Sequence, residues 1–176
     1  MRGWQTNHLR IWDEELKKLV TYYSDEEHDN HCSLLDTKIE AVFAKNVSVK
    51  RCGCGEDIVC VDTDGKEYPC QMYAPLSMSK QLFDTVKDID FSDGKNFEIP
   101  ECQQCILHSC CPACSGFNLK YNGAINKLDT FYCKAFVIQF MRTLDYRYKI
   151  ANKIADETIR NDTLHDLNEI ANAITI

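Results

Sequence analysis

Apolar residues at both ends of the chain recur at steps of three and four positions. Such steps place side chains on one face of an α-helix, so each series predicts an amphipathic helix whose apolar face packs in a core or docks another surface. The N-terminal series is Leu9, Trp12, Leu16, Leu19, Val20 and Tyr23. Two C-terminal series, separated by Asn161-Asp162, are Phe136, Phe140, Met141, Leu144 and Tyr148, and then Leu164, Leu167, Ile170 and Ala171.

The middle of the chain has a pattern closer to that of strands. Residues 39–52, "IEAVFAKNVSVKRC", alternate imperfectly, whereas residues 57–70, "DIVCVDTDGKEYPC", give two clearer runs around Asp64-Gly65. Glycine accepts the positive φ that a tight turn needs, so the second stretch predicts a β-hairpin. Such a hairpin returns Cys70 to the neighbourhood of Cys52 and Cys54 and so gathers thiols.

These patterns predict the fold class. Residues 76–100 add a short helix and a polar loop closed by Pro100. We expect a small α+β domain with a β-hairpin, irregular cysteine-rich loops and flanking helices, stabilised by what the cysteines bind.

The acidic balance of the chain excludes one class of partner. The chain has 20 Lys and Arg against 27 Asp and Glu, a formal net charge of −7, whereas non-specific nucleic-acid binding needs clustered basic residues. We therefore expect no nucleic-acid partner. The N-terminal stretch is charged throughout and no segment approaches the roughly 18 apolar residues of a membrane span, so we expect a cytoplasmic protein with no membrane association.

The eleven cysteines are the main candidate for chemistry. Their number is odd, and ten of them lie between Cys52 and Cys133 in tight clusters. From the charged N-terminal stretch we also expect no secretory leader. These features disfavour a disulfide scaffold and favour a metal or cluster site. Outside this region, His28 and His31 stand beside Cys32 with no common metal-ligand spacing, and we interpret them as part of a solvated acidic loop.

Two Cys-x-x-Cys pairs, Cys102–Cys105 and Cys111–Cys114, have the spacing with which a turn supplies two thiolates to a soft metal. Zinc sites usually take four ligands, whereas two [4Fe-4S] clusters take eight cysteines. The number of cysteines favours clusters, and two zinc ions using the same eight thiolates are the alternative.

The order "RCGCG…DTDGKEYPCQMY…CQQCILHSCCPAC…C" resembles the SPASM domain, the C-terminal auxiliary-cluster extension of radical S-adenosylmethionine enzymes such as peptide maturases. Gly65-x4-Cys70 and Cys102-x2-Cys105-x5-Cys111 fit the family pattern. The chain departs from it where Cys114 follows Cys111 after two residues rather than three. The resemblance covers residues 50–136, which leaves residues 1–49 as a connector helix and loop and residues 137–176 as C-terminal helices.

The resemblance implies a ligand set for two auxiliary [4Fe-4S] clusters. It assigns the first cluster to Cys52, Cys70 and Cys114, with Cys54 in the place of a ligand that some members have further upstream, or else an open iron there. It assigns the second cluster to Cys102, Cys105, Cys111 and Cys133. Two alternatives stay open, because Cys110 can replace Cys111 and Cys60 can replace Cys54.

The resemblance also implies an auxiliary role. The sequence contains no Cys-x3-Cys-x2-Cys motif, which holds the cluster that cleaves S-adenosylmethionine, so the chain is not expected to be catalytic alone. Its expected partners are a radical S-adenosylmethionine barrel, in cis or in trans, and a ribosomally made peptide substrate. Its expected contribution is electron transfer or substrate positioning during peptide modification, and the competing hypothesis is a zinc-binding interaction module.

Overall fold

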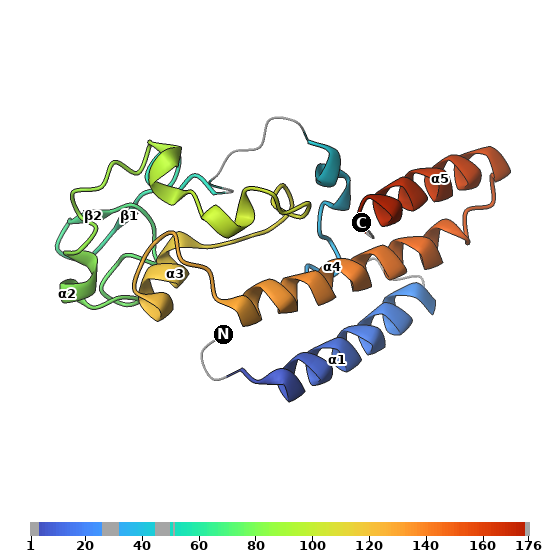
Figure 1. Cartoon of the computed structure of the whole chain (residues 1–176), viewed down its shortest axis with the longest axis horizontal. Helices are drawn as coiled ribbons and strands as arrows, with labels where there is room; N and C mark the ends of the chain where they lie inside the picture. The colour runs from blue at the N-terminus through green and yellow to red at the C-terminus, as the bar shows by residue number, and fades with distance from the viewer. Residues whose placement is uncertain (1–3, 26–31, 45–49, 51, 175–176) are drawn as a thin grey trace. The chain divides into compact units, whose positions relative to one another are not determined.

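The computed structural model describes residues 4–25, 32–44, 50 and 52–174. They divide into two compact units (Figure 1). The helical unit comprises Met1–Lys45, Ile106–Cys110 and Thr130–Ile176, and the cysteine-rich unit comprises Asn46–Cys105 and Cys111–Asp129. The described residues form helices and one two-stranded antiparallel hairpin, so the predicted α+β class is confirmed. The sequence predicts domain boundaries after residues 49 and 136.

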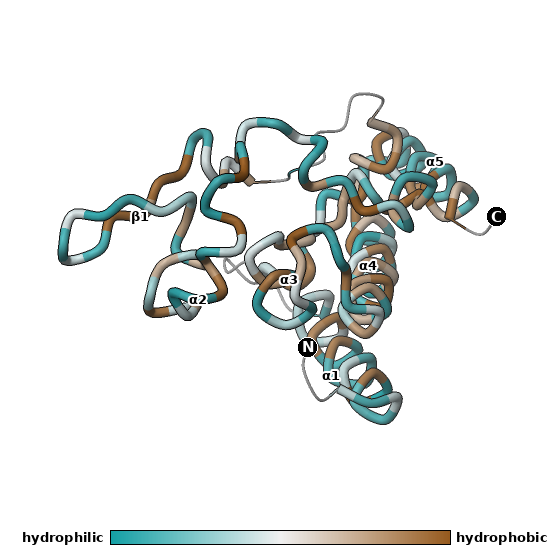
Figure 2. Tube along the Cα trace, turned by 60° about the vertical axis from the view of Figure 1, so that its left-hand side comes forward, coloured by the Kyte–Doolittle hydropathy of each residue, from teal (hydrophilic) through white to brown (hydrophobic). Residues whose placement is uncertain are grey.

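The helical unit is built from α1 (Thr6–Asp25), the 3-10 helix η1 (Ile39–Phe43), α4 (Thr130–Ala151) and α5 (Glu157–Ile174). Figure 2 shows hydrophilic and hydrophobic positions alternating around the turns of the three long helices, as their amphipathic patterns predicted. Both terminal helical regions are confirmed, but the break between the C-terminal helices lies at residues 152–156 rather than at Asn161-Asp162.

Helices α1 and α4 lie side by side and run in the same direction (Figure 1). Their apolar faces bury Leu16, Val20 and Phe140 completely. Two polar contacts fix their register: the Trp12 indole N–H donates to the Ala135 carbonyl at 3.1 Å, and the Arg142 guanidinium binds the Asp13 carboxylate at 2.7 Å. These contacts join residues more than 120 positions apart.

The expected strand character of residues 39–52 is wrong where the structure describes them. Ile39–Phe43 form η1, which buries Ile39 and Val42 against the helical unit, while residues 45–49 and 51 lie outside the described residues. The 3-10 helix explains why the apolar residues here do not alternate strictly, because it buries residues that are three positions apart.

The cysteine-rich unit contains β1 (Cys60–Val61), β2 (Glu67–Tyr68), α2 (Lys80–Phe83), η2 (Gly94–Phe97), η3 (Pro100–Cys102) and α3 (Ser115–Asn122). The predicted hairpin is confirmed: Cys60 pairs with Tyr68 and Val61 with Glu67, and Gly65 in the turn has a φ of 77°. The hairpin turn is closed by the Asp62 carboxylate, which accepts the backbone N–H groups of Asp64 and Lys66.

Aromatic side chains form the core of this unit, because its strands and helices are too short to supply one. Tyr68 packs on Phe83 at 5.1 Å between ring centroids, Tyr73 meets Phe91 edge to face at 5.0 Å, and Phe91 meets Phe97 at 5.4 Å. Tyr73 is almost fully buried. Each such ring buries a large apolar area, so a few of them hold the irregular loops together.

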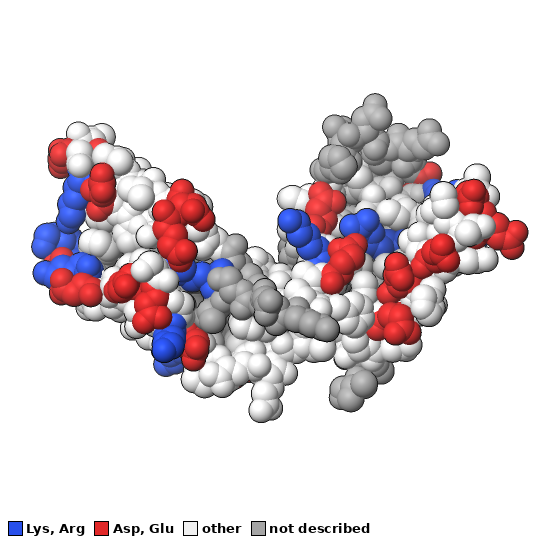
Figure 3. All heavy atoms as spheres, turned by 90° about the horizontal axis from the view of Figure 1, so that it is seen from above, with Lys and Arg blue, Asp and Glu red and all other residues white. Residues whose placement is uncertain are grey.

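The surface carries mixed charge. Lys and Arg are interspersed with Asp and Glu on the face that Figure 3 shows, and several form ion pairs along a helix, such as Arg10 with Glu14 and Lys80 with Asp84. None of the helices in the described residues is long and apolar enough to cross a lipid bilayer.

The packing of α1 on α4 gives the first prediction. We expect Leu16→Ala to lower the free energy of unfolding by about 2–5 kcal/mol, because it leaves a cavity at a side chain with no exposed surface. The matched control on the same helix is Ile11→Ala, since Ile11 is 44% exposed, and its effect should stay within about 0.5 kcal/mol. Denaturant unfolding measures both, and equal effects would contradict the packing.

Candidate metal centre

Four cysteines from three separate segments gather in the cysteine-rich unit. Cys52 and Cys54 precede the hairpin, Cys70 follows its second strand, and Cys114 precedes α3. The Cys54 thiol donates a hydrogen bond to the Cys70 sulfur, and both Cys54 and Cys114 interact electrostatically with Cys52 and Cys70. The resemblance implies Cys52, Cys70 and Cys114 as ligands of the first cluster and offers Cys54 as an alternative for the fourth. We call these four residues the four-cysteine site.

A glycine-rich turn positions Cys54. The Gly53 carbonyl accepts the N–H groups of Asp57 and Ile58, each at 2.8 Å, which folds residues 53–58 into a compact loop. Gly55 then donates its N–H to the Pro69 carbonyl at 2.9 Å and so joins this loop to the residue before Cys70. The φ of Gly55 is 75°, and a Cβ there would lie 2.3 Å from the Cβ of Phe91. Only glycine meets both conditions.

Backbone N–H groups surround the Cys70 sulfur. Met72 and Tyr73 direct their N–H groups at it, in addition to the hydrogen bond from Cys54. Together, with the Cys54 bond as the largest cause, they lower the pKa of Cys70 to about 6. The pKa of Cys54 is raised, first because its proton is held in that hydrogen bond and second because the thiol is buried. The pair therefore shares one proton near neutral pH.

Cys114 is the N-cap of α3. Its sulfur accepts the N–H of Phe117 at 3.4 Å, and its carbonyl accepts the N–H of Asn118 at 2.9 Å. Burial raises the pKa of the Cys114 thiol, although the backbone N–H groups of Phe117 and Gly116 act on the sulfur in the opposite direction. Gly116 lets the first turn of α3 approach the Cys70 segment, because a Cβ there would lie 2.6 Å from the Cβ of Met72.

A tyrosine closes the site from the core side. Tyr73 donates its hydroxyl to the Ser115 hydroxyl at 2.9 Å, and burial raises its pKa. It interacts electrostatically with Cys54, Cys70 and Cys114. Because Tyr73 lies three residues after Cys70 and Ser115 directly follows Cys114, this hydrogen bond fixes two of the cysteine-bearing segments relative to each other.

The four thiols fit a soft metal or an iron-sulfur cluster in number and in chemical type. Among the described residues, no group of three or more His, Cys, Asp or Glu side chains is already arranged to hold a metal ion. Metal binding at the four-cysteine site would release the proton that Cys54 and Cys70 share.

The remaining predicted ligands lie in both units. Cys102, Cys105 and Cys111 belong to the cysteine-rich unit, where the Cys105 N–H donates to the Cys102 carbonyl at 3.1 Å and forms a turn between them. Cys133 lies on α4 in the helical unit, and Cys110 belongs to the same unit. All eleven cysteines are described, and the structure joins none of them in a disulfide bond.

The structure also places two further groups of residues that the sequence singled out. Cys60, the alternative to Cys54, lies in β1 and packs against the aromatic core. Of the residues interpreted as a solvated acidic loop, His28 and His31 lie outside the described residues, whereas Cys32 is partly buried.

The predictions from the sequence did not include Lys50. Its ammonium group donates to the Cys54 carbonyl at 2.7 Å and to the Phe91 carbonyl, and it forms an ion pair with Glu56 at 2.5 Å. A single lysine beside a cysteine motif is ordinarily a surface residue. Only the tertiary structure shows that this one is buried.

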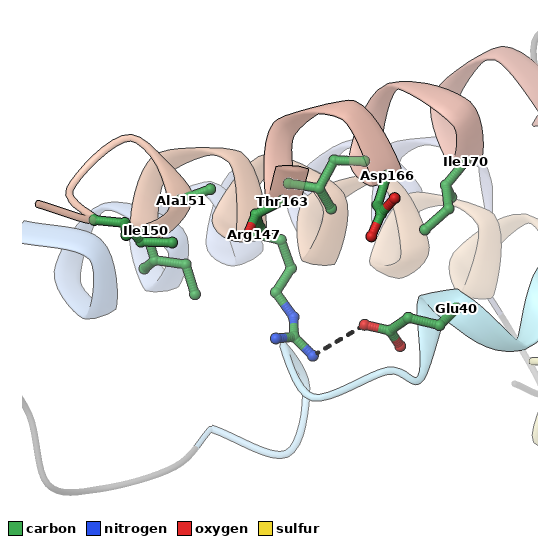
Figure 4. Close-up of a pocket in the computed structure, with 9 residues that line it drawn as sticks. Glu40, Arg147, Ile150, Ala151, Thr163, Asp166 and Ile170 are labelled. Carbon is green, nitrogen blue, oxygen red and sulfur yellow. Dashed lines mark ion pairs between the residues drawn. The ribbon is translucent and has the colours of Figure 1, made fainter. Parts of the chain in front are cut away.

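A cavity in the helical unit has a different chemistry. It has a volume of about 370 Å³ between η1, α4 and α5, and Arg147 reaches across it to Glu40 at 3.6 Å (Figure 4). Its floor is apolar, with Leu167 and Ile170 buried. No cysteine is among the residues that line it, so this cavity is not part of the four-cysteine site.

Comparison with known proteins leaves the site to be interpreted from its own residues. No protein-family model, no curated protein and no solved structure matches the chain. The function is therefore inferred from the geometry of the four-cysteine site and from the cysteine spacing.

The Gly55 turn gives the second prediction. We expect Gly55→Ala to destabilise the protein by about 2–5 kcal/mol, because it adds strain at a positive φ to an overlap with Phe91. The matched control is Gly65→Ala, which has a φ of 77° but nothing within 4 Å of the added Cβ. It should cost only the strain, about 1–2 kcal/mol. Thermal unfolding of both variants measures the difference, and equal losses would contradict the close approach to Phe91.

The hydrogen-bonded thiol pair gives the third prediction. In the reduced, metal-free protein, ultraviolet thiolate absorbance should rise with a transition near pH 6, the lowered pKa of Cys70. Cys54→Ala should move this transition to higher pH, because the largest cause of the lowered pKa is lost, whereas Cys60→Ala should leave it in place. A lowered pKa contributes stability at pH values above the unfolded value, and this contribution is lost as the pH falls through about 6. An unchanged transition in Cys54→Ala would contradict the pairing.

Proposed function

We propose that the cysteine-rich unit binds a [4Fe-4S] cluster through Cys52, Cys54, Cys70 and Cys114, and that the chain is the auxiliary cluster part of a radical S-adenosylmethionine peptide maturase. One observation carries the first half of this proposal: cysteines from three segments up to 62 positions apart gather in one small unit. The resemblance to the SPASM domain implies Cys52, Cys70 and Cys114 as ligands of one cluster, with Cys54 as an alternative for the fourth ligand.

The surroundings of the four sulfurs support a cluster. N–H groups of Met72, Tyr73 and Phe117 point at two of the sulfurs, and such donors stabilise the negative charge of thiolates bound to iron. When bound, a [4Fe-4S] cluster supplies one-electron transfer, at a potential set by burial and by hydrogen bonds to its sulfurs. The residues of this chain would hold it, exclude water through the Tyr73 and Phe91 side of the core, and fix its orientation.

The auxiliary assignment rests on the sequence. The 176 residues contain two Cys-x-x-Cys pairs and the SPASM-like order of cysteines, but no Cys-x3-Cys-x2-Cys motif. A radical-generating barrel, in cis or in trans, would then start the reaction on a ribosomally made peptide, and this chain would pass an electron or help to position that peptide. The second ligand set, Cys102, Cys105, Cys111 and Cys133, with Cys110 as the alternative to Cys111, stays a prediction from the resemblance.

A structural zinc site is the second candidate. Four thiolates from one compact unit are also the closed ligand set of structural zinc, which needs no electron transfer and no partner barrel. In that case the chain would be an interaction module, with its helices as the docking surface.

The fourth prediction separates the two candidates by metal content. After anaerobic reconstitution, we expect about eight irons and eight sulfides per chain for two clusters. The double variant Cys54→Ala/Cys70→Ala should lose about four of each, because it removes two ligands of one cluster. Cys32→Ala should keep the full content, since Cys32 belongs to no predicted ligand set, whereas a loss of iron in Cys60→Ala would assign the ligand role to Cys60 in place of Cys54. No iron uptake, with one or two zinc ions held tightly by the purified protein, would overturn the cluster proposal in favour of the zinc module.

A further inference from the structure

Lys50 is a buried cation at the edge of the four-cysteine site. Its side chain is only 6% exposed. All three N–H bonds of an ammonium group find acceptors here, namely the carbonyls of Cys54 and Phe91 and the carboxylate of Glu56. The ammonium also lies 5.1 Å from the centre of the Phe97 ring. Lysine is almost never buried to this extent unless every donor is satisfied.

The acceptors of Lys50 come from two different segments. Cys54 and Glu56 belong to the loop that Gly53 closes, whereas Phe91 lies in the aromatic core. The ammonium therefore ties the cysteine-bearing loop to the core, at the point where Gly55 also contacts Phe91. A small cavity beside it is lined by Lys50, Cys52, Ser115 and other residues of the same unit, so Lys50 and Cys52 face the same space.

The charge of Lys50 also acts on the site. Four metal-bound thiolates give the site a net negative charge, and a one-electron reduction makes it more negative, so a nearby fixed cation favours the reduced state. Glu56 opposes this effect. Its carboxylate is 46% exposed, however, whereas Lys50 is 6% exposed, and solvent screens the exposed charge more strongly.

We propose that Lys50 is a positioning residue of the four-cysteine site, which holds the Cys52–Cys54 loop against the core and makes a bound cluster easier to reduce. This inference rests on the proposed function, because it requires that the site binds a cluster.

The test measures the midpoint potential of the cluster by a redox titration of the full chain, monitored by electron paramagnetic resonance. The signal of this cluster is identified as the one that is lost in Cys54→Ala/Cys70→Ala. Lys50→Met removes the charge and keeps an unbranched apolar chain. We expect Lys50→Met to lower the ratio of reduced to oxidised cluster at a fixed potential roughly tenfold. This is the effect of removing a unit charge about 10 Å from the cluster at an effective dielectric constant of about 20. For one electron this equals about 59 mV in the negative direction.

Three further variants complete the test. Lys50→Arg keeps the charge and should retain most of the reduced fraction. Glu56→Gln removes the opposing carboxylate and should shift the ratio toward the reduced cluster. Lys66→Met removes an exposed lysine of the hairpin in the same unit and should change nothing.

The outcomes distinguish this inference from the function on which it rests. A wild-type chain that takes up no iron overturns both. A wild-type chain with the cluster, together with a Lys50→Met variant of unchanged potential, overturns only the role of Lys50. If Lys50→Met takes up no iron, the positioning role of Lys50 is supported. The electrostatic role is then decided by Glu56→Gln. A shift toward the oxidised cluster in Glu56→Gln, or no shift, would overturn the electrostatic role.

Discussion

The hydrogen bond from the Gly55 N–H to the Pro69 carbonyl is the contact on which the four-cysteine site depends. It joins the loop that carries Cys52 and Cys54 to the residue before Cys70, and it forms because glycine alone accepts a positive φ in contact with Phe91. The proximity of three of the four thiols thus follows from a backbone contact, and the sulfurs need no bond of their own to be held together. If the site binds a metal or cluster, this backbone contact reduces the conformational entropy that binding has to offset.

The cysteine-rich unit has little regular structure to stabilise it. Its sheet has two residues in each strand, and α3 with eight residues is its longest helix among the described residues. Isolated elements of this length are not stable in water. The aromatic core supplies part of the missing stability, and binding of a metal or cluster to the folded unit would add to it. If the proposed cluster binds, its removal would loosen the loops around Cys70 and Cys114 more than the helical unit.

The parts of the structure that the sequence predicted are those set by local patterns. The long helices follow from apolar spacing, and the hairpin follows from Asp64-Gly65, because both signals lie within one element. The 3-10 helix η1 was mistaken for strand, since five residues are too few to show a period. The proximity of Cys114 to the hairpin segment was predicted only from the resemblance of the cysteine order to that of a family. A local sequence pattern cannot predict a contact between residues more than 40 positions apart.

Lys50 shows the limit of sequence reasoning most directly. Nothing in "VKRCGCG" distinguishes it from a solvated lysine, since its burial depends on Glu56 and on the carbonyls of Cys54 and Phe91. Yet a buried cation costs several kcal/mol of desolvation unless it is fully paired, and a small unit does not retain such a cost without a compensating interaction. In the metal-free protein the three acceptors compensate this cost, and the negative charge of four metal-bound thiolates would add an electrostatic compensation. A lysine that is tolerable in the metal-free protein would then become favourable once the thiolates are charged.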